Sequence, residues 1–340
     1  MAIFRILSLD GGGVRGLLSA TLLDQLEQRV PGWLNNVDMV AGTSTGGIIA
    51  CGLGHGLTPA DICRFYYDRM PKIFADSLLD DITDAGGLIG AQYSLRNLRR
   101  ELKKVFGDTR LGQLHCRVVI PSFDLDQQAP GKHRHWRPRY FHNFPCEHSH
   151  PDEKVVDVAL RTSAAPTFFP TVDGYVDGGV IANNPAMVAL SHALDQSLPL
   201  PQRPQLDEIR LLSVGTGLVN TFIPGKTHDW GVGQWADPLF RILFDGLIGV
   251  PDYQCQQLLG THYSRLNYSF PAGRDVALDD WRQRDYLVEV GERRMDAELD
   301  QTALWLKNHW LAERPLMPAR RRQRARPERQ IQQVGIGPMI

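Results

Sequence analysis

Three short segments of the chain contain residue types that could perform chemistry, and the first is a run of glycines. Residues 10–16 read DGGGVRG and lie between an apolar run and a helical pattern. Consecutive glycines leave backbone N–H groups unshielded, and the N-terminus of the following helix adds positive potential. The loop is therefore expected to hold negative charge, either a bound phosphate or a transient oxyanion.

The same glycine spacing, Gly11-x-Gly13-x-x-Gly16, also fits the fingerprint of dinucleotide-binding loops. That fingerprint requires an acidic residue at the end of the second strand, where it reaches the ribose. The candidate here, Asp38, stands instead at the start of the strand expected over residues 37–41. A nucleotide-binding module remains an alternative, which predicts nucleotide affinity and no role for the serine described next.

The second segment is a G-x-S-x-G pattern over residues 42–46, between an expected strand and an expected helix. In this context the pattern is typical of a nucleophile elbow, a sharp turn that projects a serine hydroxyl above the edge of a sheet. Ser44 is the candidate nucleophile, and Gly42 and Gly46 would allow the close packing of the turn. A glycine- and serine-rich loop with a purely structural role is the alternative.

The third segment, Asp177-Gly178-Gly179, follows a short apolar pair and precedes a helical pattern. Asp-Gly is a favoured turn pair, so a simple turn is one interpretation. In the other, Asp177 is a carboxylate at a strand exit, on the same sheet edge as Ser44, and accepts the serine proton as a general base.

Strand and helix patterns alternate along the chain, which predicts an α/β protein with a parallel sheet covered on both faces. Residues 126–152 are rich in proline, histidine and arginine and are expected to be an irregular surface excursion. Strands are expected over residues 3–9, 37–41, 117–125 and 209–217. The segment 175–194 is expected as a strand, a tight turn and a helix. Further helices are expected over 14–30, 48–57, 94–107, 154–165, 252–260 and 285–311 and from residue 58.

Composition excludes several classes of protein. The 340 residues are 43% hydrophobic with a net charge of −1, which argues against a globally basic nucleic-acid binder and a highly charged disordered chain. Five scattered cysteines without a CxxC pair do not predict a disulfide framework, and a reducing compartment is the simpler inference. The N-terminus lacks the apolar region of a signal peptide, and no stretch is long and apolar enough to span a bilayer.

Taken together and in this order, the three segments resemble the patatin-like phospholipase family. Two further segments resemble it as well, TSAAPTFFP (162–170) and the strand LLSVGTG (211–217), so the resemblance extends over residues 3–260. It implies a three-layer α/β/α fold with a central, mostly parallel sheet and a serine nucleophile elbow. It also implies one catalytic domain, expected over residues 1–312. The arginine-rich composition of residues 313–340 predicts a basic C-terminal tail, which matches no motif of the family.

The resemblance assigns roles to particular residues. Ser44 would be the nucleophile and Asp177 its activating base, in a Ser–Asp dyad that forms an acyl-enzyme and needs no metal or other cofactor. Arg15 belongs to the oxyanion loop and is interpreted as a support for the helix start, with substrate contact the lesser alternative. The backbone donors of the oxyanion hole would be Gly11, Gly12 and Gly13, and the motif-supporting glycines would be Gly16, Gly42, Gly46, Gly178 and Gly179.

Several activities remain open on these motifs. The leading one is a phospholipase A or lysophospholipase acting on phospholipid at a membrane surface, in the cytoplasm or at the inner face of the membrane. Alternatives are a cyclic-nucleotide-activated phospholipase of bacterial anti-phage defence, an acyltransferase or a non-lipid esterase. A non-catalytic lipid-binding protein is a further class. Nucleic acid is not expected as a partner, and an oligomer is possible on this sequence.

Three other features allow more than one interpretation. Five histidines between residues 133 and 150 fit no zinc spacing well, so a solvated loop is favoured over a metal site. The apolar segment 235–251 is expected mainly as a core helix, with a mobile pocket cover or lipid-contacting surface as the alternative. The segment from Arg314 onward has a net charge of +6, whereas the rest of the chain has a net charge of −7. This basic tail could attract anionic lipid or could simply be solvated.

Overall fold

The computed structural model describes residues 3–74, 91–127, 133–199, 203–219 and 222–311. The loop expected over residues 77–92 lies almost entirely outside these ranges, and the basic tail expected over residues 313–340 lies wholly outside them. In the described part of the chain, no helix has both the length and the apolar character needed to cross a membrane.

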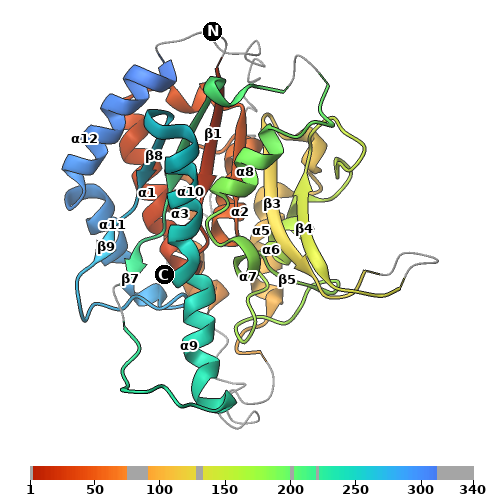
Figure 1. The fold of residues 1–340 in the computed structure, drawn as a ribbon, viewed down its shortest axis with the longest axis vertical. Helices are drawn as coiled ribbons and strands as arrows, with labels where there is room; N and C mark the ends of the chain where they lie inside the picture. The colour runs from red at the N-terminus through yellow and green to blue at the C-terminus, as the bar shows by residue number, and fades with distance from the viewer. Residues whose placement is uncertain (1–2, 75–90, 128–132, 200–202, 220–221, 312–340) are drawn as a thin grey trace, which may run out of the picture.

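The described residues are organised around one seven-stranded sheet with the order β4-β3-β2-β1-β6-β8, in which β5 pairs with β3 (Figure 1). Strands β1, β2, β3, β6 and β8 run parallel to their neighbours, whereas β4 and β5 run antiparallel to β3. The strand bounds are β1 Phe4–Leu9, β2 Met39–Gly42, β3 Arg117–Asp124, β4 Arg137–His142, β5 Tyr175–Asp177, β6 Ile209–Val214 and β8 Tyr263–Leu266. A small separate sheet pairs β7 Leu218–Val219 with β9 Ser269–Phe270.

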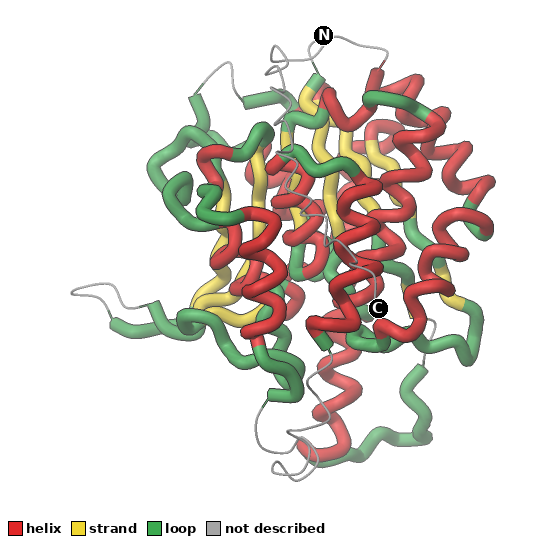
Figure 2. The backbone as a smooth tube through the Cα atoms, turned by 180° about the vertical axis from the view of Figure 1, so that it is seen from behind, coloured by secondary structure: helices red, strands yellow, loops and turns green. Residues whose placement is uncertain are grey.

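Helices cover both faces of the sheet, so the expected three-layer α/β/α architecture is confirmed (Figures 1 and 2). Alternate residues of the buried strand β1 point to opposite layers: Leu7 and Leu9 join one core cluster, and Phe4 and Ile6 join the other. The first layer contains α1 Gly16–Arg29, α2 Thr45–His55, α3 Pro59–Ile73, α5 Leu95–Phe106, α6 Val155–Thr162, α11 Arg284–Arg293 and α12 Asp296–Trp305. The second contains α8 Ala186–Ala193 and α10 Gly249–Leu259.

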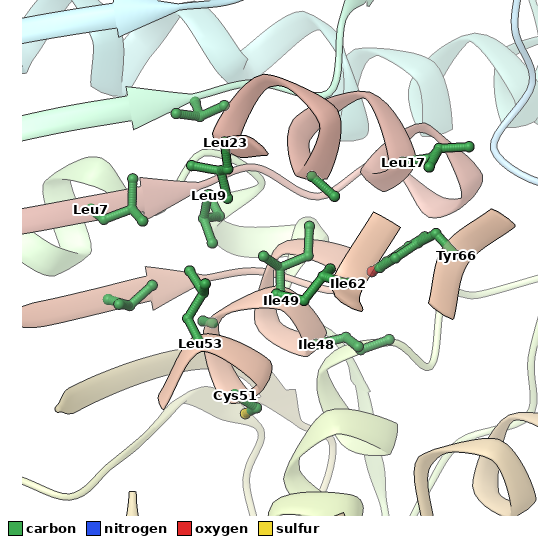
Figure 3. Packing of buried hydrophobic residues seen from close by; sticks show 14 of the residues in the cluster. Leu7, Leu9, Leu17, Leu23, Ile48, Ile49, Cys51, Leu53, Ile62 and Tyr66 are labelled. Carbon is green, nitrogen blue, oxygen red and sulfur yellow. The ribbon is translucent and has the colours of Figure 1, made fainter. Parts of the chain in front are cut away.

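The first core cluster shows why α1 and α2 lie directly on the strands that precede them. Leu7 and Leu9 of β1 pack among Leu17 and Leu23 of α1 and Ile49 of α2 (Figure 3). All five side chains are at most 1% exposed. Each strand–turn–helix unit therefore folds back on itself, and both turns, which carry the glycine loop and Ser44, come to the same edge of the sheet.

Two expectations about the elements need correction. The segment 126–152 is not wholly irregular, because it contains the antiparallel strand β4. β4 is an edge strand whose first residues are only partly buried, so it carries no apolar run that would have identified it. The helical pattern over 285–311 is divided into α11, α12 and a final turn of π-helix over Leu306–Leu311.

Candidate active site

Ser44 occupies a strained turn between β2 and α2. Its backbone has φ 54° and ψ −121°, a region that non-glycine residues rarely adopt. A Cβ on Gly42 would lie 2.1 Å from the carbonyl oxygen of Gly46, and one on Gly46 would lie 2.3 Å from that of Leu9. The turn is therefore as tight as the G-x-S-x-G pattern predicts, and it holds the serine side chain at the N-terminus of α2.

Thr162, which the sequence pattern did not single out as a site residue, holds this turn in place. Its Oγ1 accepts the backbone N–H of Ser44 at 3.0 Å and donates to the carbonyl oxygen of Pro121 at 2.6 Å. The hydroxyl therefore connects the elbow to strand β3. Thr162 begins the segment TSAAPTFFP, so the resemblance of that segment was the only sequence signal for it.

Asp177 reaches Ser44 by a route that differs from the expected one. Strand β3 pairs with β2 through its first residues and with β5 through its last ones, so β5 takes the place in the sheet where β2 ends. β5 runs antiparallel to β3, and its final residue, Asp177, lies opposite Ser122. The chain therefore brings Asp177 toward the elbow from the opposite direction rather than along a parallel strand.

The Asp177 carboxyl group is completely buried and oriented by the turn that follows it. Its Oδ1 accepts the Gly179 N–H at 2.7 Å, and Gly178 donates its own N–H to the Thr162 carbonyl at 3.2 Å. Burial raises the pKa of Asp177 to about 7, against smaller opposing effects of the Gly179 N–H and the Ser44 hydroxyl. Oδ2 makes no hydrogen bond of ordinary geometry in the described residues, although Ser44 is near enough to affect the pKa.

The three glycines of the first loop are not equivalent. The Gly11 N–H already donates to the carbonyl oxygen of Asn183 at 2.9 Å, and the Gly11 carbonyl accepts the Thr216 hydroxyl at 2.8 Å. For the N–H groups of Gly12 and Gly13, the described residues provide no acceptor. Gly12 and Gly13 also line the same pocket as Ser44 and Asp177, whereas Gly11 does not.

Arg15 points away from this pocket and ties the loop to neighbouring segments. Its Nη2 forms an ion pair with Asp245 at 2.7 Å, and its Nε and Nη1 approach the carbonyl oxygens of Gly12 and Gly217 at 3.4 Å. The side chain is 1% exposed. This placement fits the interpretation of Arg15 as a support for the helix start, and Gly16 follows it as the first residue of α1.

A narrow pocket of about 50 Å³ opens beside Ser44 and is almost entirely apolar. Its polar side chains are those of Ser44, Asp177, Thr45 and Ser163. The apolar side chains come from α2, from α3 and the residue after it, from α5, from the segment after α6, and from the distant positions Phe244 and Leu278. The apolar lining consists of Ile48, Met70, Ile73, Phe74, Leu98, Phe168, Phe169, Phe244 and Leu278, with Ala165. Such a slot suits a hydrocarbon chain attached to a carbonyl group at Ser44.

The segment 235–251, expected mainly as a core helix, is instead mostly exposed and covers most of one helix, α9, a short turn and the start of α10. α9, Val232–Phe244, projects from the body of the protein (Figure 1), and among its described residues only Phe244 is buried. Phe240 stacks on Phe244 with ring centroids 4.3 Å apart and contacts Phe168 at 5.9 Å. The Phe244 end of α9 therefore forms part of the pocket wall.

The histidine cluster is partly buried, contrary to the expectation of a solvated loop. The rings of His142, His150 and His192 pack together, with the His142 ring centroid 5.3 Å from each of the others. Burial lowers the pKa of His142 to about 4 and that of His150 to about 3, so both are neutral near pH 7. Within the described ranges, no group of three or more His, Cys, Asp or Glu residues is placed to hold a metal ion.

Comparison with known proteins now identifies the family. A family model described as patatin-like phospholipase matches residues 7–190. The chain belongs to this family. The matched part of the patatin-like chain includes the glycine loop, the elbow and Asp177, and phospholipases of this kind are carboxylic ester hydrolases.

Curated relatives of this patatin-like protein occur in bacteria and plants. CotR of Bacillus subtilis is 33% identical over 233 residues, 68% of each chain. A cGAMP-activated phospholipase of Pseudomonas aeruginosa is 28% identical over 270 residues, 78% of each chain. Patatin-like protein 2 of Oryza sativa subsp. japonica is 29% identical over 354 residues, covering 88% of this chain and 85% of the relative.

Solved structures with some likeness include two bacterial proteins. VipD of Legionella pneumophila is 13% identical with a TM-score of 0.41, covering 91% of this chain and 67% of VipD. ExoU is 13% identical with a TM-score of 0.40, covering 89% of this chain and 54% of ExoU.

Proposed function

We propose that this patatin-like protein hydrolyses acyl esters of phospholipids or lysophospholipids through a Ser44–Asp177 dyad. The observation that carries the proposal is the convergence of Ser44, in a strained elbow, with a buried Asp177 whose pKa is raised to about 7. An ordinary carboxylate is a weak base toward a serine hydroxyl, and a pKa near the working pH makes it a stronger one. The apolar pocket beside them supplies room for an acyl chain.

The proposed reaction has two steps. Ser44 Oγ attacks the ester carbonyl while Asp177 takes the hydroxyl proton, and the N–H groups of Gly12 and Gly13 stabilise the oxyanion. Gly11 is left out of these donors because its N–H is already bound to Asn183. Collapse of the intermediate breaks the ester bond, and Asp177 returns the proton to the departing alcohol. Water then attacks the acyl-enzyme with the same proton transfers and releases fatty acid.

The test of the proposed function is release of fatty acid from vesicles of defined phospholipids. We expect free fatty acid together with the matching lysophospholipid or glycerophosphodiester. Transfer of the acyl group to an added alcohol would instead favour an acyltransferase. Turnover of short-chain esters without any release from vesicles would favour a non-lipid esterase.

A second candidate is the same phospholipase under control of a cyclic nucleotide. It is favoured by the similarity to a cGAMP-activated phospholipase over 78% of each chain. The vesicle assay should therefore be run with and without cGAMP and other cyclic nucleotides. Release only in the presence of one of them would place the protein among switched effectors. A switched effector would act in the cytoplasm, where the five free cysteines would remain reduced.

We also propose that α9 brings the pocket to a lipid surface. The apolar side of α9 extends beyond Phe244, its contribution to the pocket wall, since Val232, Leu239 and Leu243 are 90%, 49% and 38% exposed. These residues lie at helical spacing beside Phe240 and Phe244, so the exposed face and the pocket wall are continuous. A lipid surface contacting this face would present acyl chains next to the pocket.

Replacing Leu239 with Asp should weaken vesicle binding by about tenfold, because a partly inserted leucine contributes ~1–2 kcal/mol. Turnover of a monomeric short-chain ester should change much less, since Leu239 does not line the pocket. Vesicle co-sedimentation and both activities would be measured. Leu304→Asp on α12, with a leucine 59% exposed, is the matched control. Equal losses in the two variants would contradict a specific role for α9.

A further inference from the structure

Asp10, the residue immediately before the three glycines, is held by a partly buried arginine from a distant strand. Its side chain is completely buried at the end of β1. Arg265 of β8 binds it with both ends of the guanidinium group: Nη1 donates to Oδ1 at 3.0 Å and Nη2 contacts Oδ2. No part of the proposed acyl transfer uses either residue.

The guanidinium group spans an intervening strand to make this contact. β6 lies between β1 and β8, and Ser213 of β6 is the register partner of Arg265. Arg265 Nη1 also donates to Ser213 Oγ at 2.7 Å, while the Asp10 N–H donates to the Val214 carbonyl at 3.1 Å. The start of the glycine loop is therefore fixed through both its backbone and its side chain.

This arrangement constrains orientation as well as position. A planar guanidinium that binds both carboxylate oxygens fixes the rotation of the carboxyl group, which a single point charge does not. Gly12 and Gly13 follow Asp10 closely in the chain. Both line the pocket, and their N–H groups have no acceptor among the described residues. Misplacement of such donors by about 1 Å can cost on the order of a hundredfold in rate.

We propose that Asp10 and Arg265 are positioning residues that set the oxyanion donors of Gly12 and Gly13. The inference rests on the proposed hydrolase function. Burying an ion pair is expensive, and apolar residues of similar volume often give equal stability, so stability alone is a poor reason for this pair. The ion pair can instead hold the glycine-rich loop in one conformation, which apolar packing would do less well. This loop needs such a restraint because glycine has the most backbone freedom to lose.

The side of Arg265 that faces away from Asp10 lines an open cleft, so a small molecule that replaces the guanidinium group can reach this position. Arg265 lines a cleft of about 590 Å³ between α10, β8 and α12, together with Asp252, Tyr263 and Trp305. Truncation to alanine in Arg265→Ala leaves Asp10 and Ser213 facing a space open to that cleft. Guanidinium ion added at millimolar concentration can enter there and replace the missing group.

The expected result is a selective loss of kcat that guanidinium repairs. Arg265→Ala should lower kcat by about a hundredfold with KM within about threefold, on the scale of a lost oxyanion donor. Affinity for a trifluoromethyl ketone, which forms an oxyanion on the serine, should fall by a similar factor. Guanidinium should restore kcat at least about tenfold, whereas urea should not. Asp10→Asn should lose kcat similarly without rescue.

Arg29→Ala is the matched control. Arg29 also forms two ion-pair contacts, one with each of the exposed carboxylates of Asp296 and Asp300, which join α1 to α12 and do not involve the glycine loop. Its kcat should be unchanged and unresponsive to guanidinium.

Three results would overturn the inference while leaving the hydrolase function intact. One is a lowered Tm with wild-type kcat per active site, titrated with a fluorophosphonate. Another is rescue of Tm by guanidinium without rescue of kcat. The third is a loss of kcat with unchanged ketone affinity. If Arg265→Ala does not fold, Arg265→Lys replaces it, with a loss of kcat expected at a Tm close to wild type. Wild-type activity in Ser44→Ala would instead remove the proposed function itself.

Discussion

Ser44→Ala should release fatty acid at least about 10⁴-fold more slowly than the wild-type protein, because it removes the atom that we propose forms the acyl-enzyme. The expected loss is in kcat, since the apolar pocket proposed to hold the acyl chain is unchanged. Fatty acid release from vesicles measures it, and labelling by a fluorophosphonate should disappear in parallel. The substitution should have little effect on stability, because the elbow is held through the Ser44 backbone N–H and Thr162 Oγ1, a contact that alanine retains.

Ser163→Ala is the comparison that gives this result its meaning. Ser163 is a second serine of the same pocket, and its buried hydroxyl has no hydrogen-bond partner in the part of the chain that the structure describes. Its loss should cost less than about tenfold, on the scale of an ordinary contact. A reversed order, with Ser163→Ala inactive and Ser44→Ala active, would assign the nucleophile to Ser163.

Asp177→Asn should reduce kcat by about 10³-fold to 10⁴-fold while making the protein more stable above neutral pH. Asn retains an oxygen that accepts the Gly179 N–H but cannot take a proton from Ser44. Folded Asp177 has a pKa of about 7, above its ordinary value of 3.8, so between these values the native state binds more protons than the unfolded state. The stability contribution of this group therefore falls as pH rises from about 4 to about 7.

The loss of kcat and the gain of stability expected for Asp177→Asn can be measured separately. The kcat of the wild type should rise through about pH 7 as Asp177 ionises, and the variant should lack this rise. Thermal unfolding should show the variant gaining stability relative to wild type over the same range, by at most about 4 kcal/mol at high pH. An Asp177→Asn protein that is less stable than wild type at pH 8 would contradict the burial-driven rise in the Asp177 pKa.

Much of the fold was predictable because its parts are local. The strands β1 and β2 and the helices α1 and α2 follow each other with short turns, and their apolar periodicity can be recognised in neighbouring residues. The elbow at Ser44 and the glycine loop are also local, since Gly42 and Gly46 are only two residues from the serine. The three-layer architecture then follows from alternating strands and helices.

The edge strands and α9 were harder to predict because their environment decides their structure. β4 pairs on one side only and keeps several polar residues, so its composition is that of a surface loop. α9 has enough apolar residues for a core helix, yet it projects from the body and exposes Val232, Leu239 and Leu243. Whether an apolar face is covered depends on what packs against it, which a periodic pattern does not contain.

The groups that could do chemistry are visible in the residues alone, because each motif spans only a few positions: a serine between glycines, a run of glycines and an Asp-Gly-Gly turn. How these groups meet depends on the folded layers. The antiparallel strand β5 brings Asp177 to the elbow, Asn183 occupies the Gly11 N–H, and Arg265 binds Asp10 from two strands away. Each of these contacts joins residues more than a hundred positions apart, and such pairings arise from the packing of whole layers rather than from any local preference of the chain.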